Sequence, residues 1–176
     1  MAEPSTARSL KRSSSPRKAA TVEGDIDTSY LETLTGYNAR RAALTIISVF
    51  LERMAQYELR PVDFSVLSLI AHNPGITSRQ LCGALDILPP NLVGMLRVLE
   101  TRGVIEKREH PTDRRAQGLH LSAAGKKLYT KAQRTASQLE LDTLSDLSPQ
   151  ERETLHSLLR RVYRPTRGPA ASDQTM

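Results

Sequence analysis

Residues 77–103 decide the fold, with the sequence TSRQLCGALDILPPNLVGMLRVLETRG. Thr77, followed three residues later by Gln80, forms a capping-box pattern that predicts the start of a short helix. The prolines at 89–90 predict the start of a second helix, because the first turn of a helix does not need their missing N–H groups. Gly103 suits the end of that helix. Two helices joined by a tight turn predict a helix-turn-helix.

The residues that follow, 104–122 (VIEKREHPTDRRAQGLHLS), predict a β-hairpin. Residues 104–108 and 118–121 have strand character, and the His-Pro-Thr-Asp segment at 110–113 is typical of a turn. A hairpin that directly follows a helix-turn-helix is the layout of a winged helix. We therefore predict a mainly α (α+β) fold in which residues 61–122 form a winged helix-turn-helix lobe.

Long helices are predicted on both sides of this lobe. Apolar residues recur at three- and four-residue spacing over 30–59, which predicts one helix about 45 Å long. A serine N-cap precedes a predicted helix over 123–144, and Ser-Pro-Gln-Glu at 148–151 is a second capping box that opens a last helix. Helices whose apolar surface is too broad for one packing face often pack across a dimer. Residues 28–60 and 123–164 are therefore predicted to be dimerisation helices.

The positive charge of the chain is concentrated in the lobe. The chain has 176 residues, with 25 Lys+Arg against 19 Asp+Glu and a net charge of +6. Residues 88–131 contain nine basic and four acidic residues, whereas 30–87 and 132–176 are each neutral. Residues 1–20 (+4) and 21–29 (−3) largely cancel. A localised basic face predicts a polyanionic partner such as double-stranded DNA.

The two ends of the chain are predicted to be tails. Residues 1–27 form a disordered basic N-terminal tail in this prediction, and 165–176 form a flexible C-terminal tail, because both contain few apolar residues. The N-terminal tail either adds loose attraction to DNA or only keeps the protein soluble. No run of 18 apolar residues and no apolar signal segment occurs, so we expect no membrane association and a cytoplasmic protein.

Patterns typical of catalysis or metal binding are absent from the sequence. It contains no Gly-x-Ser-x-Gly, no His-Glu-x-x-His and no phosphate-binding glycine loop, so we expect neither enzyme activity nor a cofactor. The four histidines do not have metal-ligand spacing, so we expect no metal. Cys82 is the only cysteine, which excludes an intramolecular disulfide. It is either a small buried hydrophobic residue or a redox-sensitive thiol.

Three short motifs carry a resemblance to a known family. They are GVIEK at 103–107, DRRA at 113–116 and LSAAG at 121–125. In this order and spacing they resemble the MarR family of bacterial transcriptional regulators, over roughly 30–163 and most strongly over 81–125. The resemblance implies a homodimeric winged helix-turn-helix protein that binds palindromic operators. It also implies release by a ligand, because small phenolic or other aromatic compounds release many members of the family.

The second helix of the helix-turn-helix is expected to enter the major groove, where its N-terminal turn brings a partial positive charge towards the phosphates. Asn91 suits a bidentate contact with adenine; alternatively, it only solvates the first turn. The start of the first helix suits a backbone phosphate. The predicted DNA-binding residues are Thr77, Ser78, Arg79, Pro89, Pro90, Asn91, Arg97, Arg108, Asp113, Arg114 and Arg115.

The wing is the second predicted DNA contact. By resemblance, Arg114 or Arg115 reaches the minor groove from the wing tip, and Asp113 braces the wing. Alternatively, these three residues are a solvated hairpin turn. Further basic residues around the hairpin are candidates for phosphate contacts: Lys107, Arg108, Lys126 and Lys127.

Gly94 is a departure from the family, whose members often carry Arg or another polar residue at this position of the second helix. A glycine inside a helix costs about 1 kcal/mol relative to alanine, so we expect a packing or close-approach reason for it. Sequence specificity is then expected to depend more on Asn91, Arg97, the wing and DNA shape.

A candidate effector site lies on the first long helix, at Tyr37, Arg40 and Arg41. Adjacent residues on a helix point about 100° apart, so only one of the two arginines faces a pocket, where it would pair with a carboxylate. Alternatively, both are ordinary surface or dimer salt-bridge residues. The arginine pair and the tendency of the family predict an aromatic acid or its thioester as effector.

The sequence thus predicts a ligand-responsive DNA-binding transcriptional regulator. We expect a repressor that binds a palindromic operator as a homodimer and is released by a small aromatic effector. The alternative is a non-specific architectural or protein-interaction winged-helix module. The two differ in the ratio of specific to non-specific DNA affinity at fixed salt.

Overall fold

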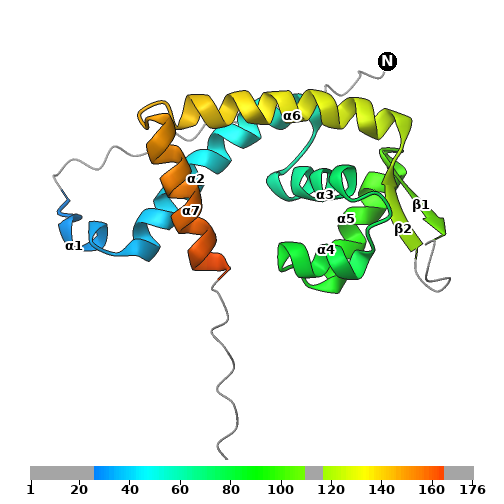
Figure 1. Cartoon of the computed structure of the whole chain (residues 1–176), viewed down its shortest axis with the longest axis horizontal. Coiled ribbons are helices and arrows are strands. Elements are labelled where there is room, and N and C mark those ends of the chain that lie inside the picture. The colour runs from blue at the N-terminus through cyan, green and yellow to red at the C-terminus, as the bar shows by residue number, and fades with distance from the viewer. Residues whose placement is uncertain (1–25, 110–116, 165–176) are drawn as a thin grey trace, which may run out of the picture.

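The computed structural model describes residues 26–109 and 117–164. The predicted wing tip and most of the two predicted tails lie outside the described residues, and so do Asp113, Arg114 and Arg115. Figure 1 shows the helices and strands of the described part. In chain order they are α1 (Ser29–Glu32), α2 (Thr35–Met54), the 3₁₀ turn η1 (Ala55–Tyr57), α3 (Pro61–His72), α4 (Ser78–Leu85), α5 (Pro89–Thr101), β1 (Ile105–Glu109), β2 (Gln117–Leu121), α6 (Ala123–Thr143) and α7 (Pro149–Tyr163).

The predicted winged helix-turn-helix is confirmed. α4 and α5 form the helix-turn-helix, and β1 and β2 pair antiparallel with Ile105 opposite Leu121. Both strands lie within one residue of their predicted bounds. An isolated bridge between Ile76 and Leu119 attaches the segment before α4 to the hairpin. The hairpin is therefore attached to the segment before α4 as well as to the segment after α5.

The predicted single helix over 30–59 is wrong. α1 ends before Leu34, whose φ of −91° and ψ of 120° are extended, and α2 begins after it. The side-chain amide of Asn38 holds this break, because it donates to the carbonyls of Glu32 (2.7 Å) and Leu34 (3.0 Å). Beyond α2, the turn η1 ends at Glu58 in the left-handed conformation, with a φ of 52°. α2 alone spans about 30 Å rather than about 45 Å.

The core lies between the C-terminal end of α2, the lobe and α6, which lies across α2 and α3 (Figure 1). The ring of Phe64 packs edge-on against Phe50, with centroids 5.8 Å apart, and stacks on Tyr129 at 5.9 Å. α1 and α7 contribute no buried residue. The largest fully buried side chains are Met54, Val66, Leu67, Ile70, Leu81, Leu92, Leu99 and Leu119.

The start of α6 is in direct contact with the end of the helix-turn-helix. Ser122 caps α6 by accepting a hydrogen bond from the Gly125 amide (3.0 Å), and its hydroxyl donates to the carbonyl of Gly103 (2.6 Å). A Cβ atom on Gly125 would lie 1.9 Å from the carbonyl oxygen of Val104. The LSAAG motif therefore needs a glycine at position 125, because the first turn of α6 touches the backbone of Val104 there.

No single helix in the described part of the chain has both the length and the apolar character to cross a bilayer. α4 and α5 pass that test only when they are taken together, and they are bent by 116° relative to each other.

Candidate nucleic-acid interface

α5 presents one side to the core and the other to solvent. Leu92, Leu96 and Leu99 are buried, at a spacing of three and four residues that places them on one face of the helix. The predicted DNA-binding residues of α5 lie outside this face and are all exposed: Pro89, Pro90, Asn91 and Arg97. The core thus fixes which side of α5 faces outward.

The outward side of α5 carries no acidic side chain. Glu100 is the single acidic residue of the helix, and it is half-buried. Its carboxylate accepts a hydrogen bond from Lys107 of β1 at 2.8 Å. This ion pair connects β1 of the wing to α5. Because Glu100 is the single acidic residue of α5, the exposed cation Arg97 has no competing carboxylate on its own helix.

The start of α4 is held by the predicted capping box. The Gln80 amide donates to the Thr77 hydroxyl (3.3 Å), and the Thr77 amide donates to the Gln80 side-chain oxygen (2.8 Å). The Thr77 hydroxyl also donates to that oxygen, at 2.9 Å, so it is committed to the cap. Ser78 is half-buried and Arg79 is exposed. Arg79 is therefore the accessible cation at this helix start.

Arg108 lies on the exposed part of β1. Its Nε donates to the carboxylate of Glu106 at 3.1 Å, and the two side chains form an ion pair. Lys126 and Lys127 are exposed on the first turns of α6. Arg108 and Lys126 meet in the wall of one cavity, beside β2.

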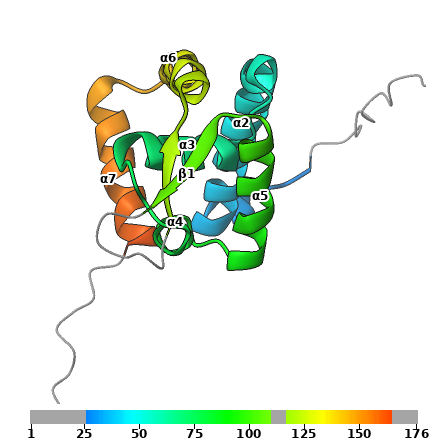
Figure 2. The same ribbon diagram turned by 90° about the vertical axis from the view of Figure 1, so that its right-hand side faces the viewer.

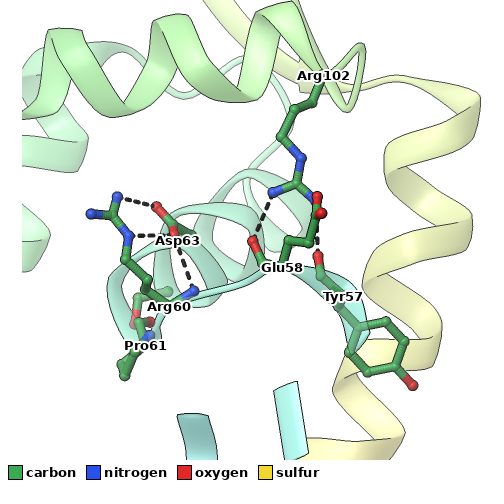
Figure 3. A network of polar contacts seen from close by, with 7 residues as sticks. Tyr57, Glu58, Arg60, Pro61, Asp63 and Arg102 are labelled. Atoms are coloured by element: carbon green, nitrogen blue, oxygen red, sulfur yellow. Dashed lines mark hydrogen bonds and ion pairs between the residues drawn. The ribbon is translucent and has the colours of Figure 1, made fainter. Parts of the chain in front are cut away.

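A polar network that sequence reasoning missed holds the C-terminal end of α5 (Figure 3). The Arg102 guanidinium donates to the carbonyls of Tyr57 and Glu58, each at 2.8 Å. These carbonyls belong to the segment that joins α2 to α3, so Arg102 couples the position of α5 to that of α2. The left-handed backbone of Glu58 turns its carbonyl towards Arg102, and neither periodicity nor composition signals such a turn.

Asp63 stabilises the start of α3 in the same region (Figure 3). Its carboxylate accepts two hydrogen bonds from the Arg60 guanidinium, at 2.8 and 2.9 Å, and one from the Arg60 amide at 3.0 Å. Burial of the carboxyl raises its pKa, but the Arg60 hydrogen bonds and the charges of Arg60 and Arg102 outweigh burial. The net pKa of Asp63 therefore lies below its ordinary value.

A cavity of about 430 Å³ lies between α3, the hairpin and α6. Two residues of its wall are linked through Ser68: His72 contacts the Ser68 carbonyl at 2.8 Å, and Tyr129 and Ser68 share a hydroxyl hydrogen bond of 3.1 Å. The wall combines apolar side chains with several basic ones. It is formed by Ile70, Ala71, His72, Pro74, Arg108, His120, Leu121, Lys126, Tyr129, Thr130 and Gln133.

The predicted effector residues lie elsewhere. Tyr37 is half-buried, and Arg40 and Arg41 are exposed, all on the N-terminal half of α2. None of the three lines the cavity described above. Cys82 is a free thiol, half-buried against the core. Among the described residues, no three His, Cys, Asp or Glu side chains gather as metal ligands.

A broad apolar surface is exposed on α1, on α2 and on α7. The apolar residues of α7 recur at helical spacing, but none of them is buried in the core of this chain. The exposed large hydrophobic residues of these helices, together with Leu34 at the break between α1 and α2, are Tyr30, Leu31, Leu34, Leu44, Ile47, Leu51, Leu158, Leu159, Val162 and Tyr163.

The chain is similar to proteins that regulate transcription. A family model described as the MarR family matches residues 57–116. A protein of Thauera aromatica, described as a transcriptional regulatory protein for the hcr operon, is 31% identical over 130 residues, which are 73% of this chain and 78% of that protein. The HosA transcriptional regulator of Escherichia coli O111:H- is 29% identical over 105 residues, which are 60% of this chain and 78% of HosA.

Solved structures extend the likeness to the fold. The transcriptional repressor CouR bound to a 23-mer DNA duplex has a TM-score of 0.75 and 34% identity, covering 80% of this chain and all of that one. CouR bound to p-coumaroyl-CoA has a TM-score of 0.70 and 32% identity, covering 80% of this chain and 99% of that one.

Proposed function

The chain belongs to the MarR family of transcriptional regulators, and from this premise we propose that it is a repressor that binds a palindromic operator as a homodimer and leaves it when a small aromatic effector binds. The observation that carries the proposal is the outward side of α5. That side is exposed, it has no acidic side chain, and it belongs to a helix-turn-helix similar to that of a repressor bound to DNA.

DNA binding is assigned to the lobe of residues 61–122. In this proposal α5 enters the major groove, with Asn91 and Arg97 towards base edges, and Arg79 approaches a backbone phosphate. The wing reaches the minor groove through Arg114 or Arg115, braced by Asp113. A duplex contacted by several cations loses affinity steeply as salt rises, so affinities must be compared at one ionic strength.

Homodimerisation is assigned to residues 28–60 and 123–164. Exposed apolar side chains at this density are uncommon on a monomer and mark interaction surfaces. A second copy that covers α1, α2 and α7 would bury them. It would also hold two copies of α5 about one helical turn apart on the duplex, which a palindromic operator requires. Arg40 and Arg41 could line a pocket only beneath such a partner.

The effector is assigned to the cavity between α3, the hairpin and α6. Its volume is that of a small-molecule site. Ile70 and Leu121 supply apolar surface for a ring, while Arg108 and Lys126 supply positive charge for an acid or thioester phosphate. Because the cavity touches the wing, a ligand that fits only a displaced wing would lower DNA affinity. CouR bound to p-coumaroyl-CoA supports this class of ligand.

In this proposal the chain acts in the cytoplasm and is not an enzyme, because it binds and releases DNA without changing a covalent bond.

The competing function is the architectural module that binds duplexes without sequence preference. Selection of bound duplexes from a random library separates the two. We expect an enriched palindrome whose affinity exceeds that of random duplex at least a thousandfold at fixed salt. Equal affinities would refute operator binding.

A matched pair of arginine variants tests the assigned face. Arg97→Ala should weaken binding to the selected palindrome about tenfold, the effect typical of losing one base-edge contact. Arg134→Ala removes the same charge from an exposed position of α6 outside the lobe and should leave affinity unchanged. Fluorescence anisotropy with labelled duplex measures both. Equal losses would show that only net charge matters.

Calorimetry tests the effector cavity. Titration with p-coumarate, benzoate and their coenzyme A esters should show binding by at least one compound, and that compound should release labelled palindrome. Lys126→Ala removes a cation of the cavity wall and should weaken this binding, whereas Lys131→Ala, on the same helix but not in the wall, should not. Binding that is unchanged in Lys126→Ala would exclude the cavity as the site.

A further inference from the structure

Gly94 lies at the centre of the outward side of α5. Residues of a helix turn by about 100° each, so the face opposite Leu92, Leu96 and Leu99 is centred on Gly94 and Thr101. Gly94 is exposed, and a Cβ atom added to it would meet nothing within 4 Å. The packing reason that its sequence position suggested is therefore not found within this chain.

The glycine also lowers the stability of its own helix. A glycine in a helix interior is less favourable than alanine because it has more backbone freedom to lose. Its φ is not left-handed, and alanine would fit the space around it. Only an object outside the chain that approaches the α5 backbone closely would require the absence of a side chain there.

The side chains around Gly94 indicate the chemistry of that object. Val93 and Val98 are 62% and 56% exposed on α5, and Pro90 is exposed one turn before Gly94. Arg97 is the single charged side chain on the outward side of α5, because the one carboxylate of this helix, that of Glu100, is half-buried and paired with Lys107. A small apolar surface with a cation at its edge suits the C5-methyl group of thymine, which is the apolar group in the major groove.

We propose that α5 lies unusually close to the floor of the major groove and reads thymine methyl groups with the surface formed by Pro90, Val93, Gly94 and Val98. This inference rests on the proposed binding of an operator. It assigns part of sequence recognition to apolar contact, in place of the polar side chain that other members of the family often carry at this position. Each half-site then contains thymine at positions that face Gly94 and its two valines.

Replacement of thymine by uracil tests the methyl contact directly. The full-length protein first selects duplexes from a random library, and each thymidine of the enriched duplex is then replaced in turn by deoxyuridine. This exchange removes one methyl group and keeps every base-pair hydrogen bond. At one or more symmetry-related positions in the half-sites, we expect a loss of affinity of about fourfold, the factor that corresponds to burying one methyl group.

Substitution of the glycine tests the close approach. Gly94→Ala should raise the melting temperature by about 3 °C, because alanine favours the helix, and yet weaken binding to the selected duplex at least tenfold. Gly83→Ala is the matched control, since Gly83 is also exposed inside a helix with nothing within 4 Å of an added Cβ. It lies on α4, is not among the residues assigned to DNA binding, and should leave DNA affinity unchanged.

The outcomes separate this inference from operator binding itself. If an operator is enriched but neither deoxyuridine nor Gly94→Ala changes its affinity, the thymine-methyl reading is overturned while operator binding stands. If no sequence is enriched, both are overturned. A stabilised Gly94→Ala protein that binds less tightly, together with the deoxyuridine effect, supports the reading.

Discussion

The winged lobe of residues 61–122 and the outer helices, by which we mean α1, α2 and α7, have similar amphipathic patterns. Only the lobe has a core of its own. α3, α4, α5 and the hairpin bury their leucines against each other and against α6. α1 and α7 bury nothing, and α2 is buried only near its end, at Phe50 and Met54. Figure 2 shows α3, α4, α5 and β1 grouped together, with α7 at the left of the view.

This difference separates what one chain can stabilise from what needs a partner. A helix gains most of its stability by burying its apolar stripe, because an isolated helix is marginal in water. The lobe satisfies that requirement within one chain. The stripe of α7, with Leu158 and Val162 exposed, does not. We therefore expect substitutions in the lobe to change folding and substitutions in the outer helices to change association.

The largest effect is expected where the lobe meets α6. Gly125→Ala would place a methyl group 1.9 Å from the Val104 carbonyl oxygen and 2.8 Å from its carbonyl carbon, so backbone must move. Overpacking of this kind costs about 3 kcal/mol or more. Urea unfolding should show that loss, and Gly36→Ala, with open space around it, should show none. A Gly125→Ala protein of wild-type stability would contradict the close contact.

The next effect concerns the outer helices. Leu158→Glu puts a charge on the apolar stripe of α7, where the side chain is 50% exposed in one copy. If a second copy covers it, the dimer dissociation constant should rise about thirtyfold or more, as for a strong interface residue. Analytical ultracentrifugation measures this change, while the melting temperature of the dilute chain should change little.

Ser157→Glu is the control for this variant. It adds the same charge one residue away, on the opposite, exposed side of α7. Its dissociation constant should match that of the wild type. If both glutamates act equally, charge rather than the apolar stripe controls association, and α7 is not part of the interface.

A smaller, pH-dependent effect is expected at Asp63, in the network that joins the two regions (Figure 3). Its pKa is lower in the folded chain than the ordinary value of 3.8, which the unfolded chain keeps. The stabilisation is therefore fully present above about pH 4 and is lost as the pH falls through the folded pKa. Asp63→Asn should cost about 2 kcal/mol at pH 7 and make unfolding less sensitive to pH below 4.

Urea unfolding between pH 2.5 and 7 measures this dependence. The exposed Asp146→Asn serves as control and should follow the wild-type curve more closely than Asp63→Asn does. Parallel curves for the wild type and Asp63→Asn would show that the Arg60 hydrogen bonds do not stabilise the folded state.

Local signals were the part of the fold that sequence could predict. The capping boxes at Thr77 and Ser148 and the glycine after α5 each involve residues within a few positions of one another, and the corresponding ends of α4, α5 and α7 are as predicted. The continuous helix over 30–59 failed because apolar spacing persists across the break at Leu34. The hydrogen bonds of Asn38 that hold this break carry no periodic signal.

The candidate site also has one part that the sequence predicts and one part that it does not. The outward residues of α5 follow from helical spacing, so they were predictable once the helix was. The cavity was not, because residues near 70, 120 and 130 approach each other only after the hairpin packs against α6. Arg102 was missed for the same reason: its partners, the carbonyls of Tyr57 and Glu58, are more than 40 positions away in the sequence.

The smallest effect is expected at the capping box, which occurs in the lobe at Thr77 and in the outer helices at Ser148. Thr77 and Ser148 each accept a hydrogen bond from the third amide of their helix at 3.3 Å. Their own backbone amides donate to the side-chain oxygens of Gln80 and Glu151 at 2.8 Å. Removing such a cap costs about 1 kcal/mol. α4 buries Leu81 in the core, so Thr77→Ala should lower the free energy of unfolding at every protein concentration.

α7 buries nothing in one chain, so Ser148→Ala should act through association instead. Its loss should appear as a weaker dimer, about fivefold by the same 1 kcal/mol, because a frayed helix must be ordered before a partner can pack on it. Urea unfolding at low and high protein concentration distinguishes the two behaviours. Equal and concentration-independent losses for both alanines would mean that α7 is stabilised within its own chain, and the contrast between lobe and outer helices would fail.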